Sequence, residues 1–183
     1  MDDYSRRAFL VWLGVCWPSI VAAQEHARRA LKNRNSGNAP ALRALSAEQA
    51  VEIEAIAAQI LPTTESPGAG EAGAIYFIDH ALATFDRARR RDYQRGLADL
   101  QARVARKFPP ARKFSALDSP RQVEVLREIE QTPFFSMVHF HTVAGFLADP
   151  HYGGNRNQVG WMVLGFDNAP THQPPFGYYD REG

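Results

Sequence analysis

Apolar residues recur at helical spacing in several long stretches of the chain, and no stretch alternates apolar and polar residues as a half-buried strand would. The first predicted helix opens at Ser46, with Gln49 as its capping-box partner, and ends at Pro62. The second is predicted from about residue 71 to 85, and the third from about 89 to 108. The pattern therefore predicts an all-α fold class.

Two further helices are predicted where a hydroxyl residue precedes a proline. Ser119 is the predicted N-cap of the fourth helix, before Pro120, and the pair Thr132–Pro133 opens the fifth helix. Beyond residue 150 the periodicity is lost, and residues 151–166 mix four glycines with three large aromatic residues. We expect a domain of about five helices followed by an irregular glycine- and aromatic-rich segment, draped over this domain or over a partner.

The N-terminus carries a twin-arginine export signal. It comprises Arg6, Arg7, Phe9 and Leu10 and introduces an apolar stretch that is too short to span a bilayer. Residues 1–23 are therefore predicted to be a signal peptide, 24–45 a flexible linker, and 46–183 the helical domain with an extended tail from about residue 150. Because this route exports folded proteins, the expected localisation is the periplasm.

The composition is that of an ordinary globular protein, with 45% hydrophobic and 22% charged residues, so the part after the leader can form one core. The single cysteine, Cys16, lies in the leader, and the mature chain is therefore expected to have no disulfide and no thiolate ligand. The sequence has no second apolar segment of membrane-spanning length. Membrane attachment of the mature chain would come through a partner or a surface contact.

Charge is divided unevenly along the chain, although the net charge is +1. Residues 46–86 contain seven acidic residues and no Lys or Arg, whereas residues 87–113 contain ten basic and two acidic residues. We interpret the two segments as helices whose charged faces attract each other. The alternative is that the basic segment binds an acidic partner or anionic lipid. Nucleic acid is not an expected partner, because export separates the protein from it and the basic segment lacks interleaved aromatic residues.

The sequence contains no nucleophile elbow, no zinc-binding His-Glu-x-x-His and no phosphate-binding loop. His139 and His141 lie two residues apart on a predicted helix, so they point in nearly opposite directions and cannot bind one metal from that helix alone. With His151 they could form a metal site across the bend at Pro150. An independent periplasmic metal-binding enzyme is therefore one alternative function, and a module for a small ligand or lipid is another.

Several short motifs follow one another in an order that resembles a known family. The motifs are Leu61-Pro62-Thr63, Pro67-Gly68-Ala69, Ala72-Gly73, Tyr76-Phe77-Ile78-Asp79, Phe134-Phe135, the stretch from Asp149 to Arg156, Gly160-Trp161 and Gly165-Phe166. From about residue 44 to 166 the chain resembles gluconate 2-dehydrogenase subunit 3. This is the small, or gamma, subunit of membrane-bound sugar and polyol dehydrogenases.

The resemblance implies a non-catalytic subunit. In that family a large flavoprotein of the glucose–methanol–choline type holds FAD and oxidises the substrate, and a multihaem cytochrome c passes the electrons to quinone. The small subunit carries the export signal that the flavoprotein usually lacks, so the folded pair is thought to cross together. The expected partners are thus an FAD-dependent large subunit, a cytochrome c subunit holding haem c, and the twin-arginine translocase.

We expect the partner interface in the segment after residue 150, and no catalytic, cofactor-binding or metal-binding residues in this chain. The expected interface residues are Tyr152, Gly153, Gly154, Asn155, Arg156, Trp161 and Phe166. Aromatic residues and Arg dominate interface energetics, so truncation of Trp161 to alanine is expected to weaken the complex by about 2 kcal/mol. The chain departs from the family pattern at Asn157, Met162 and Asp167.

Overall fold

The computed structural model describes residues 41–166 and 168, so Arg6, Arg7, Phe9 and Leu10 lie outside the described residues. The described part forms seven α-helices and four 3-10 helices and contains no strand, which confirms the all-α prediction. The elements are α2 (Ala47–Ile60), α3 (Ala69–Ala72), α4 (Ala74–Ala83), η1 (Arg87–Arg89), α5 (Arg90–Lys107), η2 (Phe114–Ala116), α6 (Ser119–Ile129), α7 (Pro133–Leu147), η3 (Pro150–Tyr152), η4 (Arg156–Gln158) and α8 (Val159–Leu164).

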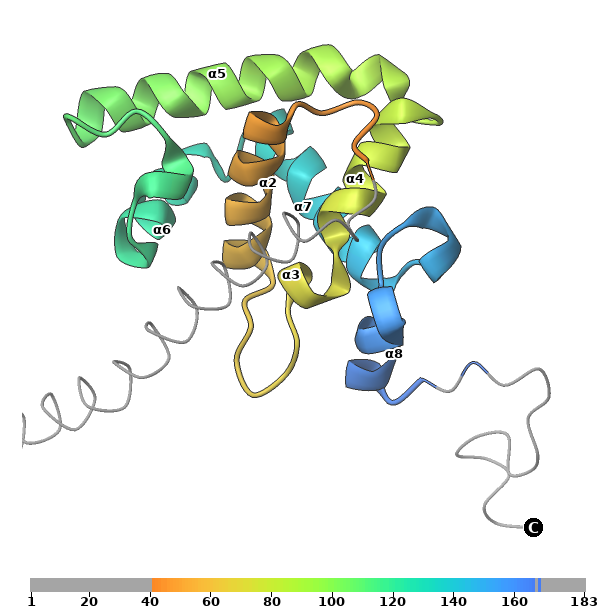
Figure 1. The fold of residues 1–183 in the computed structure, drawn as a ribbon. Coiled ribbons are helices and arrows are strands. Elements are labelled where there is room, and N and C mark those ends of the chain that lie inside the picture. Colours follow the sequence, from red (N-terminus) through yellow and green to blue (C-terminus); the bar gives the residue numbers. More distant parts are fainter. Residues whose placement is uncertain (1–40, 167, 169–183) are drawn as a thin grey trace, which may run out of the picture.

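The helices α2, α4 and α7 pack against one another, and α4 and α7 make the most extensive contact of any pair. Helix α5 runs across one end of this group, whereas α8 lies towards the opposite end (Figure 1). None of the helices in the described ranges is long and apolar enough to cross a membrane.

One hydrophobic core joins the five longer helices. Each helix contributes side chains that are almost completely removed from water, including Ile53, Ile78, Leu100, Val125 and Val138 from α2, α4, α5, α6 and α7. Burial of one such side chain stabilises the fold by about 1.5–3 kcal/mol. Ile53, Ile78, Leu100 and Val138 belong to the helical spacing that predicted their helices, whereas Val125 does not.

The helix N-termini follow the sequence signals with one correction. Ser46 and Gln49 form the predicted capping box, and the Thr132 hydroxyl accepts the Phe135 N–H at 3.2 Å. The fourth long helix is capped by Asp118 and not by Ser119, because the Asp118 carboxylate accepts the Arg121 N–H at 3.1 Å. A carboxylate also interacts favourably with the positive end of the helix dipole.

The helix predicted from residue 71 to 85 is broken into α3 and α4. The break is Gly73, whose φ of 64° is left-handed and ends α3. A Cβ at this position would lie 2.4 Å from Cδ of Arg156, so the close approach of Arg156 also requires glycine here. Helix α4 then ends at Ala83, two residues before the predicted end.

Two buried carboxylates hold loops onto the helices. Asp79 accepts hydrogen bonds from the backbone N–H groups of Arg43, Ala44 and Leu45 at 2.8–2.9 Å. Residues 43–45 are therefore fixed to α4, although the sequence placed them in a flexible linker. Glu52 likewise accepts the Phe114 N–H at 2.8 Å.

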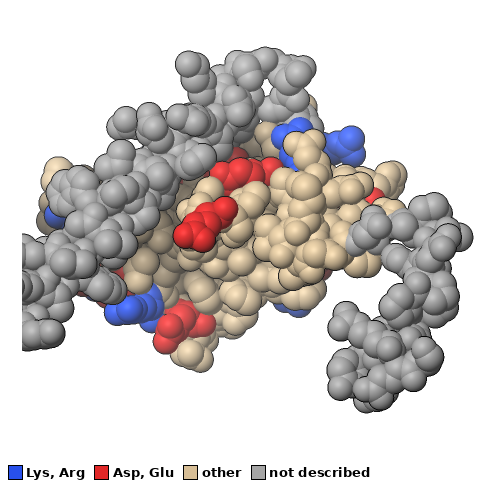
Figure 2. Space-filling view, turned by 90° about the horizontal axis from the view of Figure 1, so that it is seen from below, with Lys and Arg blue, Asp and Glu red and all other residues tan. Residues whose placement is uncertain are grey.

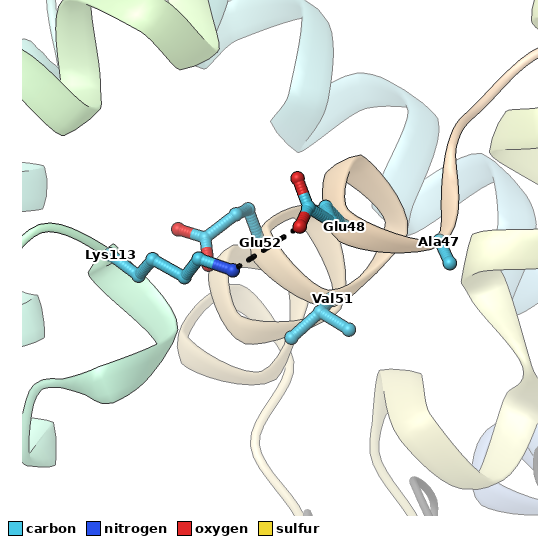
Figure 3. Close-up of a pocket in the computed structure, with 5 residues that line it drawn as sticks. All are labelled: Ala47, Glu48, Val51, Glu52 and Lys113. Atoms are coloured by element: carbon cyan, nitrogen blue, oxygen red, sulfur yellow. Dashed lines mark ion pairs between the residues drawn. The ribbon is translucent and has the colours of Figure 1, made fainter.

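Two of the acidic side chains in residues 46–86, Glu52 and Asp79, are thus buried. Figure 3 shows Glu48 and Glu52 on α2, with Lys113 reaching towards Glu48, and the Glu48–Lys113 pair spans 3.7 Å. That pair does join the acidic and basic segments, as the charge pattern suggested. Glu52 and Asp79, however, are engaged by backbone N–H groups and do not neutralise the arginines of the basic segment.

Candidate functional site

The segment after α7 folds back onto the end of that helix and onto α4. Asp149 caps η3 by accepting the His151 N–H at 2.8 Å, and Gly153, with φ 98°, ends the turn. The next two residues lie against α7. A Cβ on Gly154 would lie 2.1 Å from the carbonyl oxygen of Gly145, and that same oxygen accepts the Asn155 N–H at 2.7 Å. Glycine at 154 therefore allows backbone-to-backbone contact.

Asn155 organises the start of α8. It is fully buried in the left-handed conformation, with φ 45°, and its Oδ1 accepts the Gly160 N–H at 2.8 Å. Gly160 in turn packs on the carbonyl of Phe146, where a Cβ would lie 1.9 Å from the oxygen. The indole Nε1 of Trp161 donates to the Leu147 carbonyl at 2.7 Å.

These contacts explain why glycines, Asn and Trp occur at this spacing. The last carbonyls of a helix have no partner within the helix and need donors from elsewhere. Here Asn155 and Trp161 supply donors to Gly145 and Leu147 near the end of α7. The segment acts as a C-terminal cap for α7 and fixes α8 against it.

Arg156 ties the segment to the junction between α3 and α4. Its guanidinium lies 4.5 Å from the centre of the Tyr76 ring, and its aliphatic part lies against Gly73. A cation over an aromatic face contributes about 0.5–1 kcal/mol at a partly exposed site. The arginine of the motif therefore serves the fold of this chain.

The predicted interface residues divide between the interior and the surface. Gly154 and Asn155 are buried within the chain and are not available to touch a partner, and Gly153, Arg156 and Trp161 are partly buried. Tyr152 and Phe166 are exposed. The interface therefore remains a prediction. Only the exposed residues could contact a partner, and the buried residues hold them in position.

The sequence-based prediction did not include the most exposed residues of the segment. Met162 and Leu164 are 62% and 64% exposed, and Val163 and Phe166 are also exposed. These four residues are called the α8 apolar surface below. The end of the molecule seen in Figure 2 is covered mainly by uncharged residues. The sequence did contain a signal for this surface, namely a run of apolar residues. The helix is too short for that run to show periodicity.

A shallow apolar depression of about 380 Å³ lies beside Tyr152 and is lined by Phe77, Phe85, Ala148, Asp149 and Tyr152. Phe85 is 63% exposed at its edge, and its ring contacts that of Phe77. The described surface therefore has large exposed apolar side chains on α8, at the end of α4 and, with Phe140, on α7.

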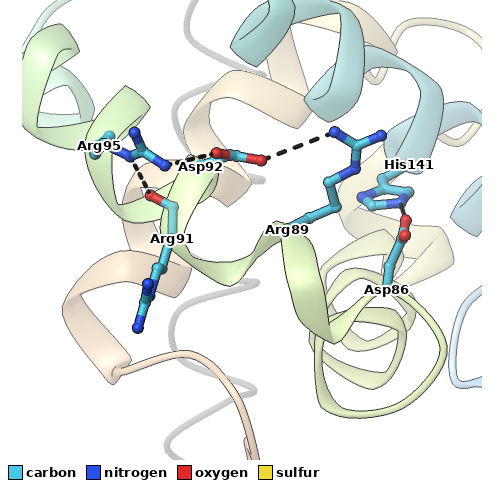
Figure 4. Close-up of polar contacts among 6 residues, drawn as sticks. All are labelled: Asp86, Arg89, Arg91, Asp92, Arg95 and His141. Carbon is cyan, nitrogen blue, oxygen red and sulfur yellow. Dashed lines mark hydrogen bonds and ion pairs between the residues drawn. The ribbon is translucent and has the colours of Figure 1, made fainter.

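A buried polar group connects three parts of the fold behind this depression. His141 on α7 is 1% exposed, and its Nε2 lies 2.8 Å from the Asp86 carboxylate (Figure 4). Its Nδ1 lies 2.8 Å from the Tyr93 hydroxyl on α5. Because a carboxylate can only accept, Nε2 carries a proton and donates it to Asp86. Burial, and then the nearby Asp86 charge, raise the pKa of Tyr93 above its ordinary value.

The histidines considered as metal ligands are not gathered into a site. His141 is engaged by Asp86 and Tyr93, His139 is exposed beside Phe135, and His151 is exposed beside Tyr152. Within residues 41–166 and 168 there is no group of three His, Cys, Asp or Glu side chains placed to hold a metal ion. What the segment after residue 150 presents to solvent is a set of exposed apolar side chains.

The described residues define a small all-helical protein whose segment after residue 150 packs on α7 and α4. Residues 47–167 match the family described as gluconate 2-dehydrogenase subunit 3, and the chain belongs to that family. It is thus a small subunit of a dehydrogenase complex, in which the cofactors reside in partner subunits. No match was found among curated proteins or solved structures.

Proposed function

We propose that this chain binds and stabilises an FAD-dependent flavoprotein of the glucose–methanol–choline type and carries it through twin-arginine export to the periplasm. The observation that supports this is the α8 apolar surface. Met162, Val163 and Leu164 on α8 and Phe166 just after it are exposed, and hydrogen bonds of Asn155 and Trp161 hold α8 in place. A six-residue helix has no stability of its own, so its fixed placement comes from the Asn155 and Trp161 contacts.

Such a surface suits a protein partner. Contiguous exposed apolar residues mark interaction sites, and pre-ordering them reduces the entropy that binding costs. Tyr152 adds an exposed aromatic side chain in the same segment. The resulting complex would oxidise a sugar or polyol at FAD in the large subunit, with a haem c subunit as the electron acceptor.

Co-purification tests the binding part of the proposal. The chain, tagged at its C-terminus, is isolated from the periplasm and membranes of its host, and an absorbance spectrum is recorded. The proposal predicts a large partner with flavin bands in near-equal amount. Recovery of a colourless chain alone would contradict it.

The export part has its own test and a matched control. Arg6→Lys together with Arg7→Lys should retain both this chain and the flavoprotein in the cytoplasm, because the twin-arginine pair addresses the translocase. The control is Arg28→Lys with Arg29→Lys, a second arginine pair that lies in the predicted linker. If the flavoprotein is exported normally alongside the Arg6/Arg7 variant, its export does not depend on this chain.

A further inference from the structure

The start of α5 carries arginines where the helix itself disfavours them. Arg87, Arg89, Arg90 and Arg91 surround its N-terminus, and Asp92 is the acidic residue of the first turn. A helix N-terminus bears a partial positive charge, so cations there destabilise the helix. Sequences break such local rules mainly where a function compensates for the cost.

The polar contacts leave most of this charge facing solvent. Arg90 is the exception, because its Nε donates to the Leu82 carbonyl at 2.7 Å and closes the end of α4. Arg89 and Arg95 both approach Asp92, at 3.8 and 3.1 Å, yet remain 59% and 76% exposed. Arg91 points away from Asp92 (Figure 4).

Acidic side chains nearby do not cancel these arginines. Asp92 serves both Arg89 and Arg95, and Asp86 is directed to His141. Neither Arg87 nor Arg91 has an ion pair with another residue of the described part, and both are exposed. Phe85, 63% exposed, precedes this cluster directly in the chain. We call Phe85, Arg87, Arg89, Arg91 and Arg95 the basic corner.

We propose that the basic corner binds the anionic phospholipid surface of a bilayer. A guanidinium forms paired hydrogen bonds with phosphate oxygens, and an aromatic ring beside it can enter the boundary between headgroups and acyl chains. The arginines are exposed on η1 and the first turns of α5, and a flat sheet of phosphates accepts exposed cations without a matching cavity.

The corner leaves the α8 apolar surface free, although its Phe85 lines the same depression as Tyr152. The corner lies at the α5 end of the molecule, whereas α8 lies towards the opposite end (Figure 1). The chain can therefore hold a flavoprotein on one side and a bilayer on the other. The lipid contact does not depend on the proposed partner, so the lipid proposal and the flavoprotein proposal can be disproved separately.

A label placed inside the corner reports this contact directly. Sedimentation with vesicles is not sufficient, because the apolar stretch of residues 9–23 can itself bind lipid. The full chain with C16S and A88C carries one cysteine, at an exposed position between Arg87 and Arg89, for an environment-sensitive fluorophore. Vesicles of phosphatidylglycerol with phosphatidylcholine should shift its emission to the blue at low salt. Phosphatidylcholine alone should not, and added salt should reverse the shift.

The charge variant and its control decide the assignment. Replacing Arg87, Arg91 and Arg95 with Gln in the labelled chain should raise the lipid concentration that gives half of the emission shift roughly 100-fold. Its urea midpoint should change little, because Arg87 and Arg91 oppose the helix dipole and the exposed Arg95–Asp92 pair contributes little. The control replaces Arg106, Arg121 and Arg127 with Gln, which removes equal charge elsewhere, and should keep the response.

Three results would overturn the proposal. The first is a label that ignores anionic vesicles, and the second is an unchanged response in the Arg87/Arg91/Arg95 variant. The third is a label that responds to the purified flavoprotein partner but not to vesicles, which would assign the corner to a protein interface.

Discussion

The indole Nε1 of Trp161 donates a 2.7 Å hydrogen bond to the carbonyl oxygen of Leu147, the last residue of α7. Trp161 thereby links α8 to the helix that packs most extensively against α4. The residue is half-buried, and the centre of its ring lies 5.4 Å from the centre of the Phe166 ring. It therefore positions the α8 apolar surface from within this chain.

Trp161→Phe should lower the free energy of unfolding by about 1 kcal/mol, because it removes the hydrogen bond and leaves the Leu147 carbonyl without its donor. Urea unfolding of the purified chain measures this change. The matched control is Met162→Ala, whose side chain is exposed on the same helix and should change stability by less than about 0.5 kcal/mol. Equal stability of Trp161→Phe and wild type would show that the bond contributes nothing.

Gly154→Ala should destabilise the chain by about 3 kcal/mol, since the new Cβ would lie 2.1 Å from the Gly145 carbonyl oxygen and force the segment off α7. Thermal or urea unfolding gives the difference. Gly70→Ala is the control within α3, where a Cβ meets nothing within 4 Å, and it should stabilise by about 0.5 kcal/mol. If both alanines are tolerated equally, the close backbone contact is not required.

The raised pKa of Tyr93 predicts a loss of stability at alkaline pH. Burial, and secondarily Asp86, keep the phenol protonated in the folded state, whereas in the unfolded chain it ionises near pH 10. The unfolded state therefore binds fewer protons above that pH, and stability falls by up to about 1.4 kcal/mol per pH unit. Below pH 10 this contribution is fully present.

Tyr93→Phe isolates that contribution. At pH 8 the variant should be about 1 kcal/mol less stable than wild type, because the contact with His141 is lost. Above pH 10 its stability should decline less steeply, so the two unfolding curves should approach each other and then cross. A constant difference between wild type and variant from pH 8 to 11 would contradict the burial argument.

Local signals in the sequence predicted the helices well. Capping by Ser46 with Gln49, and by Thr132, depends on residues within one turn and appears in the structure as expected. Asp118 was overlooked in favour of Ser119, although both are capping residues, because the proline pattern alone does not fix the first position. The left-handed Gly73 breaks the predicted second helix, and the close approach of Arg156, more than 80 residues later, could not be predicted from neighbouring residues.

The candidate site was predictable in place but not in detail. The glycine- and aromatic-rich composition located the segment, yet the burial of Asn155 results from contacts with Gly145 and Gly160 that form only in the fold. The group of Asp86, Tyr93 and His141 joins residues up to 55 positions apart. Their helical spacing alone could not show that they meet.

We propose that the α8 apolar surface binds the flavoprotein partner. The most direct measurement is the affinity of the full chain carrying M162D and L164D for the purified flavoprotein, compared with wild type. Both side chains are exposed, so the urea midpoint should stay unchanged while the affinity falls at least about 30-fold, or about 2 kcal/mol. The control, A98D with A102D, adds two carboxylates at exposed positions of α5 and should bind as wild type. An affinity of M162D/L164D within threefold of wild type would contradict the claim.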